Sequence, residues 1–146
     1  EKMGINFLNY LDLPGVSDKS YEKMHMNWLE DIKKVNGYKA EKEGGARCLA
    51  CYEYRLRLAC RIACLRSFDY FATTLTISPH KNSEIINKIG IQAEEECKKS
   101  SIPGKTCPKF FLADFKKDEG FRKSIENSKR LGLYRQRYCG CEFSIW

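Results

Sequence analysis

The sequence predicts a single α/β domain, and two observations support this class. Short runs rich in β-branched and aromatic residues alternate with longer runs in which apolar residues recur every three or four positions. Hydrophobic residues make up 42% of the 146 residues, which is enough to build one core. No internal repeat is visible, and no apolar run approaches the roughly 18 residues of a membrane span. We therefore expect one domain over residues 1–146 and no membrane partner.

Three short segments are expected to be strands. The first is residues 5–11, which the turn at residues 13–15 ends. The second is residues 70–77, before Ser78 and Pro79, and the third is residues 109–115. β-branched and aromatic side chains fit a pleated surface, and the second segment is apolar enough to be a buried strand.

Four segments have the periodicity of helices. The first ends before the glycine pair within residues 43–46, and its apolar residues are Tyr21, Met24, Trp28, Ile32 and Val35. The second runs from about Cys51 to Phe68, and its apolar stripe consists of Tyr52, Leu56, Ala59, Cys60 and Ala63. The third begins near Ser83 and points Ile85, Ile86 and Ile89 inward, before a polar loop over residues 98–108. The fourth, marked by Phe121 and Ile125, ends near Gly132.

The charge balance favours an anionic partner. The chain has 26 Lys and Arg against 19 Asp and Glu, a formal net charge of +7. Arg55, Arg57 and Arg61 lie on the second expected helix, and Arg57 and Arg61 share one of its faces because they are four residues apart. A basic chain with exposed aromatic residues is suited to binding RNA, although a solvated helix face explains the arginines equally well.

Eight cysteines are the most informative feature of the composition. A secreted disulfide protein is disfavoured, because the first residues have no basic stretch that leads into an apolar one. We therefore predict a cytoplasmic protein, in which clustered cysteines serve as metal ligands or redox groups. Four of them form the tight pairs Cys48-x-x-Cys51 and Cys139-x-Cys141. Such pairs can bind zinc or an iron-sulfur cluster where two loops meet at a sheet edge, or they can be buried thiols without chemistry.

Three stretches, in this order, resemble the short epoxyqueuosine reductases of the QueH type. They are "EGGARCLACYEYRLRLACRIA" (residues 43–63), "FDYFATTLTISPHKN" (68–82) and "LGLYRQRYCGCEFS" (131–144), and "NWLEDIKKVNGYKAE" (27–41) is similar as well. The resemblance implies a Rossmann-like three-layer domain with a mostly parallel sheet. It also implies a 4Fe-4S cluster, an additional iron, and the reduction of epoxyqueuosine to queuosine in tRNA with electrons from a donor that the sequence does not identify.

The resemblance also implies roles for single residues. The four paired cysteines match the family's cysteine motifs and would be the metal ligands Cys48, Cys51, Cys139 and Cys141. The proton donors expected near the leaving oxygen are Tyr138, His80 and Asp69, although an exposed loop histidine and a turn aspartate explain the last two equally well. The residues expected to contact the substrate are Ser78, Lys81, Arg55, Tyr134, Arg135 and Gln136. Packing of Tyr134 and Tyr138 in the core, with a solvated Lys81, is the alternative.

Two further expectations complete the sequence analysis. Cys60, Cys64, Cys97 and Cys107 match no family cysteine, so we expect scattered apolar or surface thiols there. The family's first strand ends in adjacent cysteines, and we find no such segment. We therefore expect the chain to lack that strand, to bind iron and sulfide weakly, and to reduce epoxyqueuosine poorly. A non-catalytic RNA-binding module stabilised by zinc is the alternative function, and metal content would separate the two.

Overall fold

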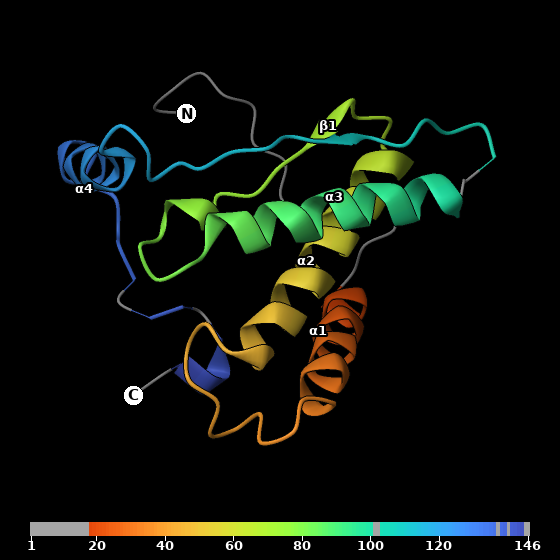
Figure 1. Ribbon diagram of the computed structural model, residues 1–146, viewed down its shortest axis with the longest axis horizontal. Coiled ribbons are helices and arrows are strands. Elements are labelled where there is room, and N and C mark those ends of the chain that lie inside the picture. Colours follow the sequence, from red (N-terminus) through yellow and green to blue (C-terminus); the bar gives the residue numbers. More distant parts are fainter. Residues whose placement is uncertain (1–17, 101–102, 137, 140, 145–146) are drawn as a thin grey trace.

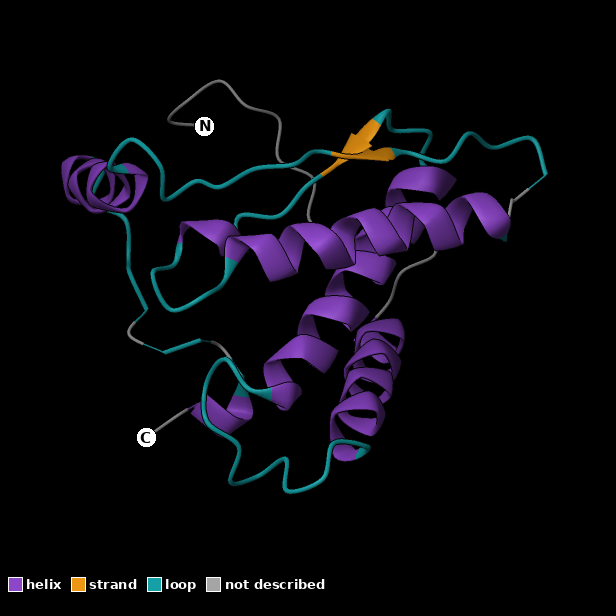
Figure 2. Ribbon diagram, viewed as in Figure 1, coloured by secondary structure: helices purple, strands orange, loops and turns teal. Residues whose placement is uncertain are grey.

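The computed structural model describes residues 18–100, 103–136, 138–139 and 141–144. The predicted strand at residues 5–11 lies outside these ranges. The described part contains four α-helices, two strands and two short 3₁₀ helices (Figures 1 and 2). In chain order they are α1 (Asp18–Lys33), α2 (Ala46–Leu65), β1 (Tyr70–Phe71), η2 (Leu75–Ile77), α3 (Ser83–Lys99), β2 (Lys109–Phe110), α4 (Gly120–Arg130) and η3 (Glu142–Ser144). None of these helices combines the length and the apolar character that crossing a bilayer requires.

The core lies where α2 crosses α3 (Figure 1). The apolar stripe predicted for α2 is confirmed, since Tyr52, Leu56, Cys60 and Ala63 are buried and Ala59 is partly buried. On α3, Ile86 and Ile89 face this core as predicted, but Ile85 is 39% exposed, so its predicted inward orientation is wrong. Successive helical residues are rotated by about 100°, and Ile85 therefore points away from α2 when Ile86 points toward it.

The two strands form a parallel pair that α3 connects. Tyr70 pairs with Lys109, and Phe71 pairs with Phe110. The rings of Phe71 and Phe110 lie 5.1 Å apart and pack in the same core as the stripe of α2. Gly90 makes room for them, because a Cβ there would lie 2.4 Å from the Phe110 ring. A β-α-β unit with a parallel pair confirms the α/β class, whereas the described part does not confirm a three-layer Rossmann-like arrangement.

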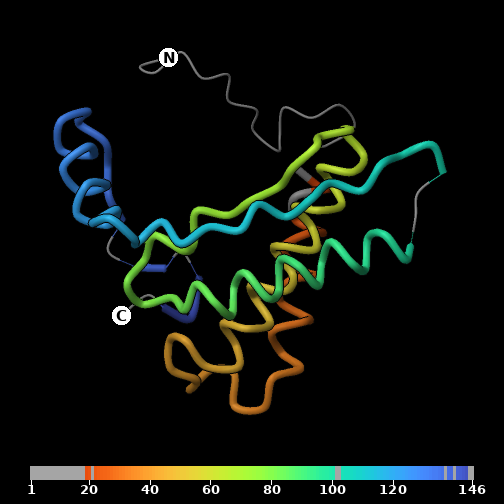
Figure 3. The backbone as a smooth tube through the Cα atoms, turned by 45° about the horizontal axis from the view of Figure 1, so that its top comes forward, coloured from red at the N-terminus to blue at the C-terminus, as the bar shows by residue number. Residues whose placement is uncertain are grey.

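Both strands are shorter than predicted, because side chains take over their backbone hydrogen bonds. After Phe71, the Thr73 hydroxyl accepts the Leu75 N–H, and the chain turns into η2. After β2, the Asn87 side chain on α3 bonds both the N–H and the C=O of Ala113. The two segments still run side by side over α3 (Figure 3), but only the first residues of each form a ladder.

Helix boundaries fix where the functional residues lie. α2 begins at Ala46, five residues before the predicted start, so the Cys48-x-x-Cys51 pair lies in the first turns of a helix rather than in a loop. The predicted end of α4 is confirmed. Gly132 there has a φ of 62°, its N–H bonds Lys129, and the Leu133 N–H bonds Ser128. These two hydrogen bonds form a Schellman motif, which ends α4 and turns the chain toward Cys139 and Cys141.

Candidate metal centre and adjoining cavity

The four paired cysteines, here called the cysteine centre, come together at the N-terminal end of α2. Cys48 and Cys51 project from the first turns of that helix, and Cys139 and Cys141 lie in the segment that leads into η3. The charges of Cys139 and Cys141 act on Cys51, and those of Cys139 and Cys48 act on Cys141. The fold therefore brings the two pairs together, while their role as metal ligands stays a prediction.

Each sulfur of the cysteine centre accepts a hydrogen bond from an N–H group. The Trp28 indole on α1 donates to Cys51 at 3.3 Å, and the backbone N–H of Gly44 donates to Cys48 at 3.2 Å. The Lys81 ammonium donates to Cys139 at 3.3 Å. The backbone N–H of Phe143 donates to Cys141. N–H donors of this kind stabilise thiolates, which are the metal-binding form of cysteine.

Burial disfavours the thiolate form of two cysteines in the same centre. It raises the pKa of the Cys51 thiol, although the hydrogen bond from Trp28 acts in the opposite direction. It also raises the pKa of Cys141, against the hydrogen bond from Phe143. Burial likewise raises the pKa of Tyr52, which lies close to Lys81 and the cysteines, to about 12. A bound cation would offset this cost by stabilising the thiolates directly.

A single zinc ion and an iron-sulfur cluster require different spacings between their cysteine sulfurs. Four thiolates around one tetrahedral zinc lie about 3.8 Å apart, because each Zn–S bond is about 2.3 Å. Within the part of the chain that the structure describes, no three sulfurs of this centre lie within 4.8 Å of one another. An iron-sulfur cluster places each thiolate on a different iron, so its ligands are more widely spaced.

Two buried donors beside the cysteine centre also fit an additional acceptor. The Tyr52 hydroxyl and the Nε of Arg47 have no hydrogen-bond partner among the described residues. Tyr52 is within electrostatic range of Cys48, Cys51 and Cys139, and Arg47 acts on Cys141. Buried donors normally find partners. The sulfide atoms of a cluster would be suitable acceptors for both groups.

A cavity of about 460 Å³ opens next to the cysteine centre. Cys51, Cys139 and Cys141 form part of its wall, together with three predicted residues, Arg55, Gln136 and Tyr138. His25 and Trp28 of α1 add to the wall a ring pair whose centroids are 5.5 Å apart. Aromatic planes and an arginine around an open cavity suit an unpaired base and its phosphate.

Lys81, one of the predicted substrate residues, is buried, so the alternative of a solvated Lys81 is wrong. It is only 8% exposed, and its ammonium bonds Glu43 at 2.9 Å as well as Cys139. Burial disfavours its charge, but the hydrogen bond to Glu43 and the proximity of Cys139 outweigh that effect and raise the pKa of Lys81. Lys81 therefore stays protonated and compensates negative charge at the cysteine centre.

The segment before α3, residues 78–82, has fewer free hydrogen-bond donors for a phosphate than the sequence predicts. The Ser78 hydroxyl accepts the backbone N–H of His80, and the imidazole of His80 lies on an exposed turn. The Asn82 side chain caps α3 by accepting the N–H groups of Glu84 and Ile85. These are the donors that a phosphate at the helix start would need.

Three other predicted residues lie away from the cavity wall. Tyr134 is 85% exposed, so the alternative that it packs in the core is wrong. The Arg135 guanidinium donates to Ser124 and Ser128 of α4, which fixes the loop after that helix. Asp69 follows the C-terminal end of α2, whereas the cysteine centre lies at the N-terminal end of the same helix.

Sequence reasoning missed the residues that hold the Cys141 segment in place. Arg47 is 3% exposed, donates to the Tyr38 carbonyl at 2.6 Å and lies over the Phe143 ring. The Phe143 ring also contacts Tyr38 and Trp28. Arg47 is the second residue of α2, and the apolar periodicity of a helix does not predict that an arginine there is buried. Its position next to Cys48 in the sequence was the one available indication of a role.

The remaining four cysteines, here called the second cysteine group, are scattered in the sequence, but three of them lie close together in the fold. Cys60 and Cys64 are buried on α2, and Cys97 and Cys107 are half-buried. The sulfurs of Cys64, Cys97 and Cys107 lie within 4.8 Å of one another. The burial of Cys60 and Cys64 agrees with the expected small apolar thiols. The sequence did not indicate that α2, α3 and the segment before β2 bring three of the thiols together.

Comparison with known proteins decides the family. Residues 5–146 match the family model described as epoxyqueuosine reductase QueH. The chain belongs to this family. It is 42% identical over 115 residues to the epoxyqueuosine reductase QueH of Streptococcus pyogenes serotype M1, covering 79% of this chain and 42% of that protein.

Two further relatives show how far the similarity extends. The family member of Thermotoga maritima is 38% identical over 120 residues, which is 80% of this chain and 58% of that protein. The one of Histophilus somni is 32% identical over 145 residues, which is 99% of this chain and 51% of that protein. The chain therefore spans about half the length of the curated relatives it matches.

Proposed function

We propose that this protein reduces epoxyqueuosine to queuosine in tRNA, and that Cys48, Cys51, Cys139 and Cys141 hold its 4Fe-4S cluster. Family membership supports the reaction. The observation that carries the site is that each of the four sulfurs accepts an N–H hydrogen bond from the surrounding chain. When bound, the cluster supplies electrons to a reaction that takes two electrons and two protons and releases the epoxide oxygen as water.

The chain's own residues hold and orient the reactants. Lys81 fixes Cys139 and keeps a positive charge beside the thiolates. We assign the modified base to the cavity, where Gln136 can bond a base edge and Arg55 can contact a phosphate. Tyr138, at the cavity wall and 45% exposed, is the proposed proton donor to the leaving oxygen. Asp69 is left out of this proposal because of its place at the far end of α2.

The wider features of the family remain part of the proposal. The parallel β1-α3-β2 unit supports a Rossmann-like three-layer domain in the whole protein. The net charge of +7 supports tRNA as the partner, in a cytoplasmic setting. An additional iron and an external electron donor complete the reaction that we propose.

Anaerobic reconstitution tests this function directly. The protein would be loaded with iron and sulfide, reduced chemically and mixed with tRNA carrying epoxyqueuosine, and the nucleosides would be separated by mass. We expect several irons and sulfides per chain and a product lighter by one oxygen, and we expect both to be lost in the variant Cys139→Ser/Cys141→Ser. The matched control Cys97→Ser/Cys107→Ser should keep them. Zinc without sulfide that is lost in Cys139→Ser/Cys141→Ser but kept in Cys97→Ser/Cys107→Ser would instead favour the non-catalytic RNA-binding module.

A further inference from the structure

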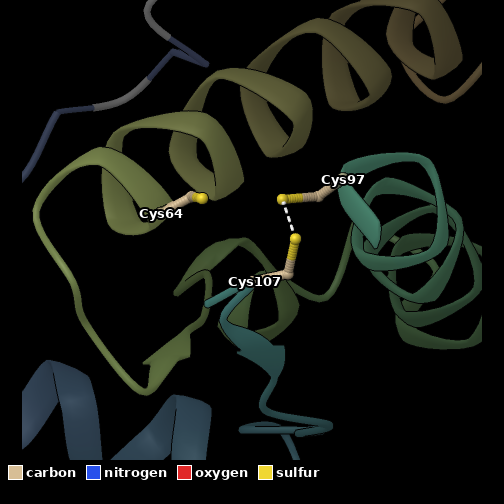
Figure 4. Close-up of side chains that lie close together, drawn as sticks. All are labelled: Cys64, Cys97 and Cys107. Carbon is tan, nitrogen blue, oxygen red and sulfur yellow. Dashed lines mark hydrogen bonds between the residues drawn. The ribbon is translucent and has the colours of Figure 1, made fainter. Parts of the chain in front are cut away.

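The second cysteine group joins three separate parts of the fold. Figure 4 shows the thiols of Cys64, Cys97 and Cys107 pointing toward one another from α2, α3 and the segment before β2. The sulfurs of Cys97 and Cys107 are 2.8 Å apart. Cys60, one helical turn before Cys64, lies beside this group, and its thiol donates to the Ala93 carbonyl at 3.6 Å. Three thiols therefore meet at one place with a fourth beside them, and none of them belongs to the cysteine centre.

Local structure explains why these thiols converge. Cys60 and Cys64 are four residues apart on α2, so both project from the same helix face. That face packs on α3, whose last turns carry Cys97. Cys107 comes just before Pro108 and β2, and the pairing of β2 with β1 holds it over the end of α2.

We propose that Cys60, Cys64, Cys97 and Cys107 bind one zinc ion as four thiolates. Tetrahedral binding requires sulfurs about 3.8 Å apart, given Zn–S bonds of about 2.3 Å. Three of the sulfurs already lie within 4.8 Å of one another, so these three reach zinc with shifts of about 1 Å. Cys60 joins them when its thiol leaves the Ala93 carbonyl and loses its proton. Binding converts four neutral thiols and Zn²⁺ into a tetrathiolate complex of charge −2 and releases four protons, with no change of oxidation state.

The surroundings suit such a site. A cavity of about 370 Å³ reaches Cys60 and Cys97 and gives an ion a path from solvent. Arg61, which is exposed and lines this cavity, places a positive charge near the complex. Lys98 lies within electrostatic range of Cys107. A zinc ion here would tie the ends of α2 and α3 to the sheet, and its role would be structural because all four positions are filled by protein.

Paired variants separate this site from the cysteine centre. The variant Cys139→Ser/Cys141→Ser removes two thiols of the cysteine centre, and the variant Cys97→Ser/Cys107→Ser removes two thiols of the second group. The intact protein and both variants would be purified without oxygen in the presence of zinc, and bound zinc would be counted. We expect one zinc per chain in Cys139→Ser/Cys141→Ser, with at least a tenfold loss of zinc affinity in Cys97→Ser/Cys107→Ser.

Two further measurements keep the proposal testable if Cys97→Ser/Cys107→Ser does not fold. Zinc X-ray absorption of Cys139→Ser/Cys141→Ser should show four sulfurs at about 2.3 Å. Cobalt in place of zinc should give the visible bands of a tetrahedral thiolate complex in that variant. A ligand set that contains nitrogen or oxygen, the absence of bound zinc, or a Cys97–Cys107 disulfide in protein purified without oxygen would overturn the proposal. Because none of these readouts needs turnover, failure here would leave the proposed function untouched.

Discussion

Replacing Lys81 by methionine removes the buried ammonium beside the cysteine centre while keeping most of the side-chain volume. Two interactions are lost, one to Glu43 at 2.9 Å and one to Cys139 at 3.3 Å. A hydrogen bond to a charged group contributes about 1.5–3 kcal/mol. The Glu43 side chain is 40% exposed and regains water in the variant, so we expect the free energy of unfolding to fall by only about 1–2 kcal/mol.

The effect on the bound metal should be larger than the effect on stability. If Cys139 is a ligand, the lost bond from Lys81 weakens iron binding by about 10–100-fold, which is the usual effect of removing a group that orients a ligand. Iron and sulfide per chain would be measured after anaerobic loading and gel filtration. The exposed Lys88 of α3 gives the matched control Lys88→Met. Equal iron retention in Lys81→Met and Lys88→Met would refute our account of Lys81.

Three other predictions concern RNA binding and the core. Arg55 lines the cavity, so Arg55→Gln should weaken tRNA binding in a filter assay and lower its logarithmic salt slope by about one. Arg57 is already paired with Glu53 and Glu96, so Arg57→Gln should leave tRNA binding unchanged. Gly90→Ala forces a Cβ to 2.4 Å from the Phe110 ring and should destabilise the fold by about 1–2 kcal/mol in urea. Recovery is expected with Phe110→Leu added, and no loss in Gly90→Ala alone would contradict the packing. Glu94→Ala removes the acceptor of the Phe110 N–H at 2.7 Å and should cost about 1–3 kcal/mol.

The Glu94 prediction also has a pH dependence with a definite sign. The hydrogen bond from Lys98, followed by the one from Phe110, lowers the pKa of Glu94 in the folded chain. A carboxyl group with a lowered pKa contributes stability above its unfolded pKa of about 4.3 and loses it as the pH falls through the folded value. Urea unfolding of the original chain should therefore lose this contribution below about pH 4. Glu94→Ala should show a correspondingly smaller loss in that range.

Helices α2 and α3 were predictable because each has an apolar stripe that a 3.6-residue period reveals. α2 shows this well, since the stripe predicted around Leu56 is buried against α3. The beginning of α2 was missed because Gly45 is its N-cap and gives no side-chain hydrogen bond. Without a Ser, Thr, Asp or Asn at that position, the sequence has no clear start signal.

The predicted lengths of the two strands were wrong for a different reason. β-branched residues predicted a strand through residue 77, but Thr73 and Asn87 use their side chains as backbone partners, and these contacts depend on tertiary structure. The second cysteine group was missed in the same way. The distance between Cys64 and Cys97 in the sequence carries no information about their meeting, which follows only from the packing of α2 on α3.

The two groups of cysteines are connected by one rigid element, and this predicts how they influence each other. Cys48 and Cys64 lie near opposite ends of the 20-residue helix α2. A rise of about 1.5 Å per residue separates them by about 24 Å along the helix axis, so they cannot share a ligand or an ion. Loss of the second cysteine group therefore affects the packing of α2 but removes no contact of the cysteine centre. We expect Cys97→Ser/Cys107→Ser to lower the thermal midpoint of unfolding and to leave the iron content of the cysteine centre unchanged.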